Sequence, residues 1–204
     1  MSDVVKKDFL LLCKEAESCV KCPKLAEKKA VLSLLNGSLS PVVFFIAEAP
    51  GRKGADRTRR PFYGDQSGDN FQLLIDSIGL KREEIFITNA VLCSPRSESG
   101  ANRKPSKSEI KNCSEFLKRQ IELMNPKIIA TLGSTALEAL KYIENHEFTL
   151  KTHVGKILDW NGRKLIPLYH PSPQVVISVR SLEKQMEDFM KLRRAIEVIL
   201  KRAL

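Results

Sequence analysis

The residues best suited to chemistry lie in two segments that are far apart in this sequence. The first runs from Ala47 to Gly64, and the second is the motif His170-Pro171-Ser172-Pro173. Each segment follows a short apolar run that predicts a buried strand. In an open parallel sheet, the loops that leave the carboxyl ends of the strands meet over one crevice. We therefore expect an acid, an aromatic ring and an imidazole to share one pocket.

The elements that must position these loops alternate between strand and helix. Strands are predicted over 42–46, 85–91, 127–132 and 165–169, where the residues are apolar and often branched or aromatic. Helices are predicted over 4–17, 69–78, 106–124 and 181–203, and another is predicted to begin at 133–135. The Asn161-Gly162 pair predicts a hairpin turn. We expect one domain over residues 1–204 with an α/β fold, a three-layer αβα sandwich around a central, mainly parallel four-stranded sheet.

The charge balance bears on the class of partner. Lys and Arg number 34 against 24 Asp and Glu, which gives a net charge of +10. Such an excess favours a polyanionic partner, because neutralising phosphates supplies most non-specific affinity for nucleic acid. The alternative is a solvated basic surface with no such partner. No apolar stretch approaches the ~20 residues that span a bilayer, and the N-terminus does not read as a signal peptide, so we expect a cytoplasmic protein that does not act at a membrane.

The five cysteines are spaced in a way that suggests a metal centre. Cys19 and Cys22 form a close pair, while Cys93 follows the second strand and Cys113 lies in the next helix. A disulfide is not expected in the cytoplasm. Four thiolates suit either zinc or a [4Fe–4S] cluster, and the spacing does not choose between them. The remaining alternative is two unrelated pairs of thiols, and Cys13 is expected to be a small buried residue.

Four blocks of residues occur in an order that can be compared with known families. They are the Cys19 and Cys22 pair, the loop over 48–64, the run over 88–93 that ends in Cys93, and the His170 motif. Together with Cys113 they resemble the iron–sulfur branches, families 4 and 5, of the uracil-DNA glycosylase superfamily. The resemblance extends from Cys19 through the His170 loop.

The loop over 48–64 resembles both branches. Its Glu48-Ala49-Pro50-Gly51 and Arg60-Pro61-Phe62 motifs look like family 4. Its length, the run from Gly54 to Thr58 and the Gly64-Asp65 pair look more like family 5. The hybrid leaves two candidates for the catalytic acid, Glu48 and Asp56. We favour Asp56 at this point because the loop length agrees with family 5.

The resemblance implies a monofunctional enzyme that flips uracil, or another deaminated base, out of DNA and hydrolyses its N-glycosidic bond. It implies that His170 stabilises charge on the leaving base and that Asp56 or Glu48 acts at the sugar. Uracil would be held by Ala49, Gly51 and Phe62 of the first loop and by Asn89 at the end of the second strand. It also implies a monomer whose thiolates, from Cys19, Cys22, Cys93 and Cys113, hold a structural [4Fe–4S] cluster, with zinc as the alternative.

Residues expected to contact DNA lie in loops that follow the predicted strands. Basic or hydroxyl side chains there suit phosphates, and the candidates are Arg57, Arg60, Arg96, Arg103, Ser134 and Ser172. Val175 and Val176 are apolar candidates to fill the space that a flipped base leaves. Two other functions stay open: a non-catalytic protein that binds damaged DNA, and a zinc-stabilised nucleic-acid-binding module.

Overall fold

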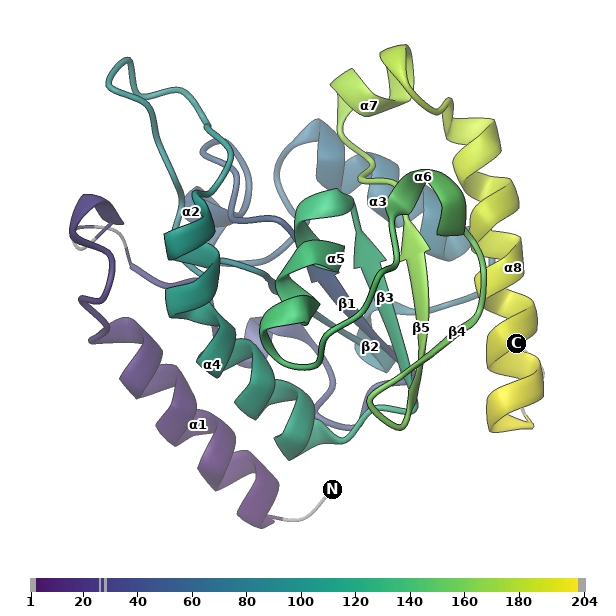
Figure 1. The fold of residues 1–204 in the computed structure, drawn as a ribbon, viewed down its shortest axis with the longest axis horizontal. Coiled ribbons are helices and arrows are strands. Elements are labelled where there is room, and N and C mark those ends of the chain that lie inside the picture. Colours follow the sequence, from purple (N-terminus) through teal and green to yellow (C-terminus); the bar gives the residue numbers. More distant parts are fainter. Residues whose placement is uncertain (1–2, 26, 28, 202–204) are drawn as a thin grey trace.

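In the computed structural model, which describes residues 3–25, 27 and 29–201, a twisted sheet lies between two layers of helices (Figure 1). The sheet has the order β2-β1-β3-β5-β4. Its strands are β1 Val43–Ala47, β2 Ile85–Asn89, β3 Ile128–Leu132, β4 Leu158–Trp160 and β5 Arg163–Leu168. All neighbouring pairs are parallel except β4 with β5. The predicted α/β class is confirmed.

The predicted number of strands is wrong, because the sheet has five strands rather than four. The missed strand is β4, which spans three residues and buries only Trp160 fully, so it lacks the apolar run that marks the others. The turn after it was predicted. Asn161 and Gly162 adopt φ of 47° and 69°, the left-handed pair that a two-residue hairpin turn requires.

Helices cover both faces of the sheet. The described helices are α1 Asp3–Glu17, α2 Ala55–Thr58, α3 Gln66–Asp76, α4 Lys107–Met124, α5 Ser134–Ala139, α6 Leu150–His153, α7 Pro173–Ser178 and α8 Leu182–Leu200, with short 3-10 turns η1 Pro23–Leu25, η2 Leu34–Asn36, η3 Arg82–Glu84 and η4 Leu140–Tyr142. The helices α1, α4 and α5 contribute to one apolar core, and α3 and α8 contribute to the other. The end of the predicted last helix, 202–203, lies outside the described residues.

Alternation along β1 explains how one strand serves both cores. Phe44 and Ile46 face the core on the α1 and α4 side, while Val43 and Phe45 face α3 and α8. All are fully buried, as expected for a strand covered on both faces. The parallel register then brings the carboxyl ends of β1, β2, β3 and β5 to one edge, which is where the predicted site residues begin.

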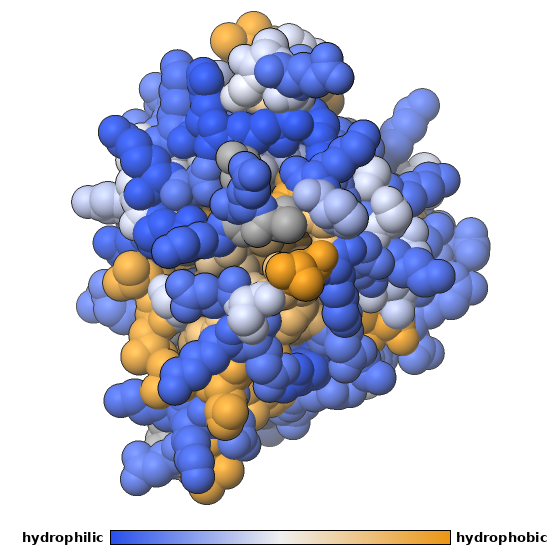
Figure 2. Space-filling view, turned by 90° about the vertical axis from the view of Figure 1, so that its left-hand side faces the viewer, coloured by the Kyte–Doolittle hydropathy of each residue, from blue (hydrophilic) through white to orange (hydrophobic). Residues whose placement is uncertain are grey.

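The outer surface is mainly hydrophilic on the face that Figure 2 presents, with apolar side chains gathered in its lower half, the height at which α1 lies in Figure 1. The exposed apolar residues of α1 are Val4, Leu10 and Leu11. No described helix is long and apolar enough to cross a bilayer.

Candidate active site

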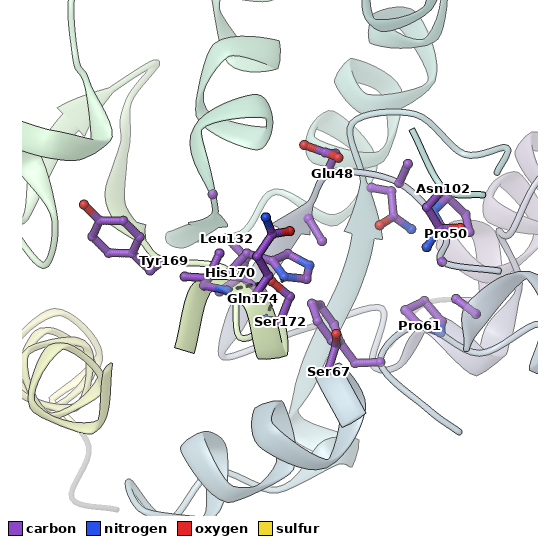
Figure 3. A pocket seen from close by; sticks show the side chains of 18 of the residues that line it. Glu48, Pro50, Pro61, Ser67, Asn102, Leu132, Tyr169, His170, Ser172 and Gln174 are labelled. Atoms are coloured by element: carbon purple, nitrogen blue, oxygen red, sulfur yellow. Dashed lines mark hydrogen bonds between the residues drawn. The ribbon is translucent and has the colours of Figure 1, made fainter. Parts of the chain in front are cut away.

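A cavity of about 520 Å³ opens at the carboxyl edge of the sheet (Figure 3). Most of the predicted site residues line it: Glu48, Ala49, Gly51, Phe62, Asn89, Arg103, Ser134, His170 and Ser172. Asp56, Arg57, Arg60 and Arg96 are not among its lining residues. The expected meeting of an acid, an aromatic ring and an imidazole in one pocket is therefore observed, with Glu48 as the acid.

Glu48 follows β1 directly and is held by a neighbouring helix. Its Oε2 accepts a hydrogen bond of 2.6 Å from the hydroxyl of Thr135, a buried residue in the first turn of α5. A carboxylate fixed through one oxygen keeps acceptor capacity on the other. Sequence reasoning did not identify Thr135, because a threonine in a helical first turn carries no signal of this contact.

Phe62 belongs to a row of neighbouring planar groups. Its ring stacks on Phe71 at 4.6 Å and lies 5.3 Å from the His170 ring. The guanidinium of Arg82 lies 5.6 Å from the other ring of this stack, that of Phe71, and donates to the carbonyl of Pro61. Burial lowers the pKa of Arg82 to about 10, so it remains charged at neutral pH. This row fixes the face that Phe62 presents to the pocket.

The backbone at Phe62 is strained, with φ of 48°, a region that non-glycine residues rarely adopt. The strain is sustained by close packing. A Cβ atom at Gly68 of α3 would meet the carbonyl carbon of Phe62 at 2.7 Å, so only glycine lets the loop approach the helix so closely. Arg82 was missed by sequence reasoning, since it lies in no recognisable motif.

Asn89 ends β2 with its side chain in the pocket wall. It is 4% exposed, and its Nδ2 has no hydrogen-bond partner among the described residues. The strand ends beside it are fixed, because the N–H groups of Ala90 and Val91 donate to the carbonyls of Ala47 and Glu48. A buried amide donor without a partner costs about 1–3 kcal/mol. Because the fold keeps this unpaired donor, the site is a candidate for binding a ligand that offers a hydrogen-bond acceptor.

His170 is held in one protonation state. The backbone N–H of Ser172 donates to its Nδ1 at 3.1 Å, which leaves the proton of the neutral ring on Nε2. Burial lowers its pKa from 6.5 to about 4, so the ring is neutral at physiological pH. The loop is tied to α3, because Nδ2 of Asn70 donates to the carbonyl of Pro171 at 2.9 Å. His170 is thus a neutral hydrogen-bond donor, with Asn70 as a support that the sequence did not reveal.

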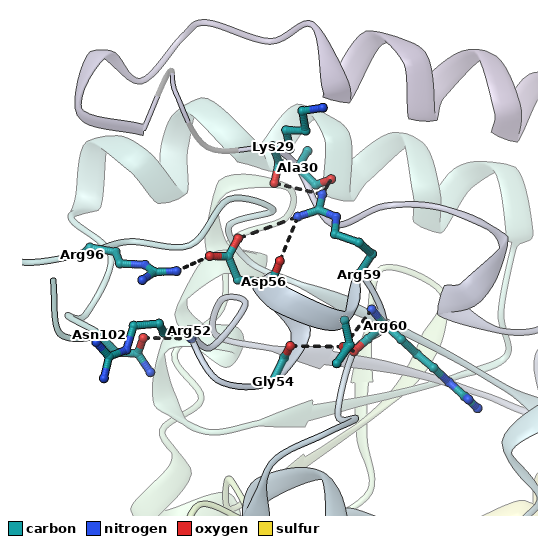
Figure 4. A network of polar contacts seen from close by, with 10 residues as sticks. Lys29, Ala30, Arg52, Gly54, Asp56, Arg59, Arg60, Arg96 and Asn102 are labelled. Atoms are coloured by element: carbon teal, nitrogen blue, oxygen red, sulfur yellow. Dashed lines mark hydrogen bonds and ion pairs between the residues drawn. The ribbon is translucent and has the colours of Figure 1, made fainter.

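Asp56 lies outside the pocket, in a network of cations on α2 (Figure 4). Its side chain is 15% exposed and is paired with Arg96 and, at 3.7 Å, with Arg59. Arg59 also donates to the carbonyls of Lys29 and Ala30. The two candidate acids are therefore in different settings, with Glu48 in the cavity and Asp56 neutralised by arginines.

The residues predicted to contact DNA also differ in whether they are paired with a carboxylate. Arg103 forms a two-pronged pair with Glu109 at 2.6 and 2.8 Å, and Arg96 is paired with Asp56. Arg57 and Arg60 pair with no carboxylate in the described part of the chain. Ser134 is exposed at the start of α5, and the hydroxyl of Ser172 caps α7.

The four predicted thiol ligands line one second cavity. Cys19, Cys22, Cys93 and Cys113 come together between the end of α1, the start of α4 and the segment after β2. The N–H of Leu92 donates to the sulfur of Cys113 at 3.3 Å. Burial raises the pKa of Cys93 to about 11 and that of Cys113 to about 12, so without a bound cation both stay protonated.

The chemistry of this cavity suits a thiolate-bound group. Among the described residues, no three His, Cys, Asp or Glu side chains are placed to hold one metal ion. Four thiols that converge on one cavity are a donor set that suits either zinc or a four-iron cluster.

Comparison with known sequences decides the family. Residues 36–193 match the profile of the uracil DNA glycosylase superfamily. The chain belongs to this superfamily. It is 33% identical to a type-4 uracil-DNA glycosylase of Thermotoga maritima, over 79% of this chain and 80% of that protein. It is 36% identical to a type-4 uracil-DNA glycosylase of Sulfurisphaera tokodaii, over 88% and 80%.

Similarity to the type-5 branch is also present. The chain is 26% identical to a type-5 uracil-DNA glycosylase of Pyrobaculum aerophilum, over 85% of this chain and 87% of that protein. The predicted resemblance to both branches of the superfamily is confirmed. The higher identity to the type-4 proteins agrees with the position of Glu48, the residue of the type-4-like motif, in the cavity.

Proposed function

We propose that this protein is a uracil-DNA glycosylase of the type-4 kind that starts base excision repair. The superfamily membership and the type-4 relatives support this function. The observation that carries it in this chain is the buried Nδ2 of Asn89, which points to a missing acceptor in a cavity that also contains Phe62 and His170.

Asn89 suits uracil because a side-chain amide both donates and accepts. Its Nδ2 would donate to O4 of the flipped base, and its Oδ1 would accept from N3–H. Cytosine carries a donor at position 4 and an acceptor at N3, so it reverses both bonds. Phe62 offers a fixed face for stacking, and the backbone of Ala49 and Gly51 lines the same cavity.

The proposed reaction divides the charge between two residues. The N1–C1′ bond breaks with its electron pair going to uracil, and the neutral His170 donates from Nε2 to O2 as negative charge grows there. Glu48 faces the positive sugar and orients the water that attacks C1′, accepting its proton. We therefore prefer Glu48 to Asp56 as the catalytic acid, which reverses the expectation from loop length.

DNA would lie across the mouth of the cavity. Arg57 and Arg60 are available for phosphates, and Ser134 and Ser172 lie at the rim. Arg96 and Arg103 are engaged by acids and would order their loop instead. On α7 the exposed apolar side chain is Ile177, at 84%, whereas Val175 and Val176 are half-buried, so Ile177 is the better residue to fill the vacated stack.

Cys19, Cys22, Cys93 and Cys113 are proposed to hold a structural [4Fe–4S] cluster, with zinc as the alternative. When bound, such a cluster cross-links the chain through four thiolates. Base excision needs no electron transfer, so the reaction uses other residues. The protein is further proposed to act as a single-domain monomer in the cytoplasm on DNA that contains uracil or other deaminated bases.

The test is single-turnover base release from a duplex with one uracil opposite guanine. The same duplex with cytosine is the control, and strand cleavage should need added alkali. Wild type should release uracil only. Glu48→Gln should lower the rate by about 10²–10⁴ while DNA binding persists. Binding of uracil DNA without release by the wild type would support a damage-binding protein instead.

Asn89→Ala gives a sharper arm of this test. It should lower uracil release roughly 10–100-fold, since a hydrogen-bonded pair to the base is lost. It should not lower the melting temperature, because the amide that it removes has an unsatisfied donor in the absence of DNA. A variant that loses stability but retains uracil release would refute the assigned role.

Metal analysis of the same sample tests the cysteine centre. Iron and sulfide near four equivalents each, with visible absorbance, would support the cluster. A colourless protein with one zinc would contradict it and favour the zinc-stabilised alternative.

A further inference from the structure

Asp56 is shared by two arginines that come from different directions (Figure 4). Arg59 lies on its own short helix end, and Arg96 lies on the segment that follows β2. The carboxylate is largely buried, at 15% exposure, and its backbone N–H donates to the carbonyl of Gly51. The residue is thus anchored in the pocket loop by its backbone, while its side chain pairs with one arginine of that loop and with one from outside it.

Each arginine makes further hydrogen bonds that connect it to a segment next to a cysteine. Arg59 donates to the carbonyls of Lys29 and Ala30, in the segment that follows Cys22. The next residue along, Val31, donates its N–H to the carbonyl of Leu92, beside Cys93. One side of the network therefore reaches the cysteine centre through the backbone.

The second side reaches the same centre through α4. The carbonyl of Arg96 accepts from Nε of Arg103 at 3.1 Å, and Arg103 makes the two-pronged pair with Glu109 in the first turn of α4. Cys113 is one turn further along that helix. Both routes from Asp56 thus end on segments whose sulfur atoms line the second cavity.

On the other side of Asp56 lies the uracil pocket. Gly51, Ala55, Pro61 and Phe62 of the same loop line the cavity, although Asp56 does not. Movement of α2 would therefore move the wall that faces the base.

We propose that Asp56 is a positioning residue that ties the pocket loop to the cysteine centre, so that the order of the Phe62 wall depends on the cysteine-bearing segments. This inference rests on the proposed function for its effect on uracil release, but the tie itself does not. Removing one partner of a partly buried ion pair leaves the other charge uncompensated. Arg96 is poorly placed to bear this loss, since its Nε already has no partner among the described residues.

The test compares Asp56→Asn with Glu48→Gln and with Asp159→Asn. Asp159 is a matched control, because it is an exposed aspartate paired with Lys164 on β5. The readouts are single-turnover uracil release over a range of DNA concentrations, amide hydrogen exchange over 51–62 and 94–103, and the rate at which a chelator removes the bound metal.

Asp56→Asn should raise the DNA concentration for half-maximal rate about tenfold and change the rate at saturating DNA less than about threefold. Exchange should quicken in both segments, and metal should leave faster. Asp56→Glu should restore part of each effect. The double variant Asp56→Asn with Arg96→Gln should change each readout no more than the single variant with the larger change, because the two residues act as one unit.

A catalytic role for Asp56 would give the opposite pattern. The rate at saturating DNA would fall at least 100-fold, with exchange and metal release unchanged, and the proposal would be overturned. Equal behaviour of Asp56→Asn and Asp159→Asn would also overturn it. If wild type released no uracil, the proposed function would fail, whereas the exchange and metal-release readouts would still decide whether the tie exists.

Discussion

The cavity at the carboxyl edge and the cysteine cavity differ in whether their polar groups already have hydrogen-bond partners. In the first, Nδ2 of Asn89 has no partner among the described residues, and His170 accepts a hydrogen bond at Nδ1, so that its ring proton lies on Nε2. In the second, N–H groups already point at sulfur, from Leu92 to Cys113 and from Asn112 to Cys22. A cavity that retains unsatisfied groups suits a transient ligand, while one whose thiol sulfurs already accept hydrogen bonds suits a resident group.

This contrast separates residues whose loss should affect rate from residues whose loss should affect stability. Asp56 lies between the two regions and belongs to neither cavity. Substitutions in each region test whether the separation holds.

The largest effect is expected for His170→Ala. Loss of one preorganised donor to a developing oxyanion lowers turnover by about 10²–10³. Single-turnover uracil release at saturating DNA should fall by this factor, while DNA affinity and the melting temperature change little. His153→Ala is the control, since the His153 ring lies outside the cavity lining and hydrogen-bonds within its own turn. Equal loss of binding and rate would contradict the division between the two regions.

Cys113→Ser should act on stability. Cys113 is proposed to be a ligand and receives the Leu92 N–H, so its loss should remove the bound metal and lower the melting temperature by about 10 °C. Cys13→Ser is the matched variant. Cys13 packs against the same core, and burial raises its pKa to about 11, which makes it a small apolar residue. It should retain the metal and lose no more than about 4 °C.

The measurement pairs thermal unfolding with metal content and visible absorbance. The fraction of Cys113→Ser that remains folded should still release uracil within about tenfold of wild type. A folded variant with no metal and no loss of stability would remove the structural role of the cysteine centre.

Arg82→Met should have a smaller effect, confined to recognition. It removes the hydrogen bond to the carbonyl of Pro61 and the guanidinium that lies against the ring of Phe71. The residue before Phe62 and the ring on which Phe62 stacks therefore each lose a contact. A hydrogen bond that involves a charged group contributes about 1.5–3 kcal/mol, so the DNA concentration for half-maximal rate should rise roughly tenfold. Phe62→Leu and the double variant should behave alike. Additive effects would show that Arg82 acts on something other than Phe62.

The sequence predicted the strands that are buried on both faces, the long helices and the residues at the strand ends, because apolar runs and period are local signals. It missed β4, which is too short to form an apolar run. It also gave no sign of Thr135, Arg82 or Asn70, because each acts through a contact between residues distant in sequence.

Our preference moved from Asp56 to Glu48 for a related reason. Loop length reports the number of residues, whereas the role of an acid depends on which partners the fold gives it. Asp56 pairs with Arg59 of its own loop and with Arg96, which lies forty residues later in the chain. Only the folded arrangement distinguishes an acid that is neutralised by cations from one that faces a cavity.

The smallest effect is expected in the pH dependence of stability. The pKa of His170 is about 4 in the folded protein and near 6.5 when exposed, so the unfolded chain binds more protons between these values. The contribution of His170 therefore makes the protein more stable as pH rises from 4 to 6.5, and it is constant above that range. In thermal unfolding at a series of pH values, His170→Gln should show a shallower loss of melting temperature on acidification, by about 5 °C at pH 4.5. Since the ring is neutral throughout the range from pH 5 to 8, uracil release should show no step near pH 6.5. Such a step in wild type, absent from His170→Gln, would mean that the imidazole is solvated and that the pocket does not hold it as a neutral donor.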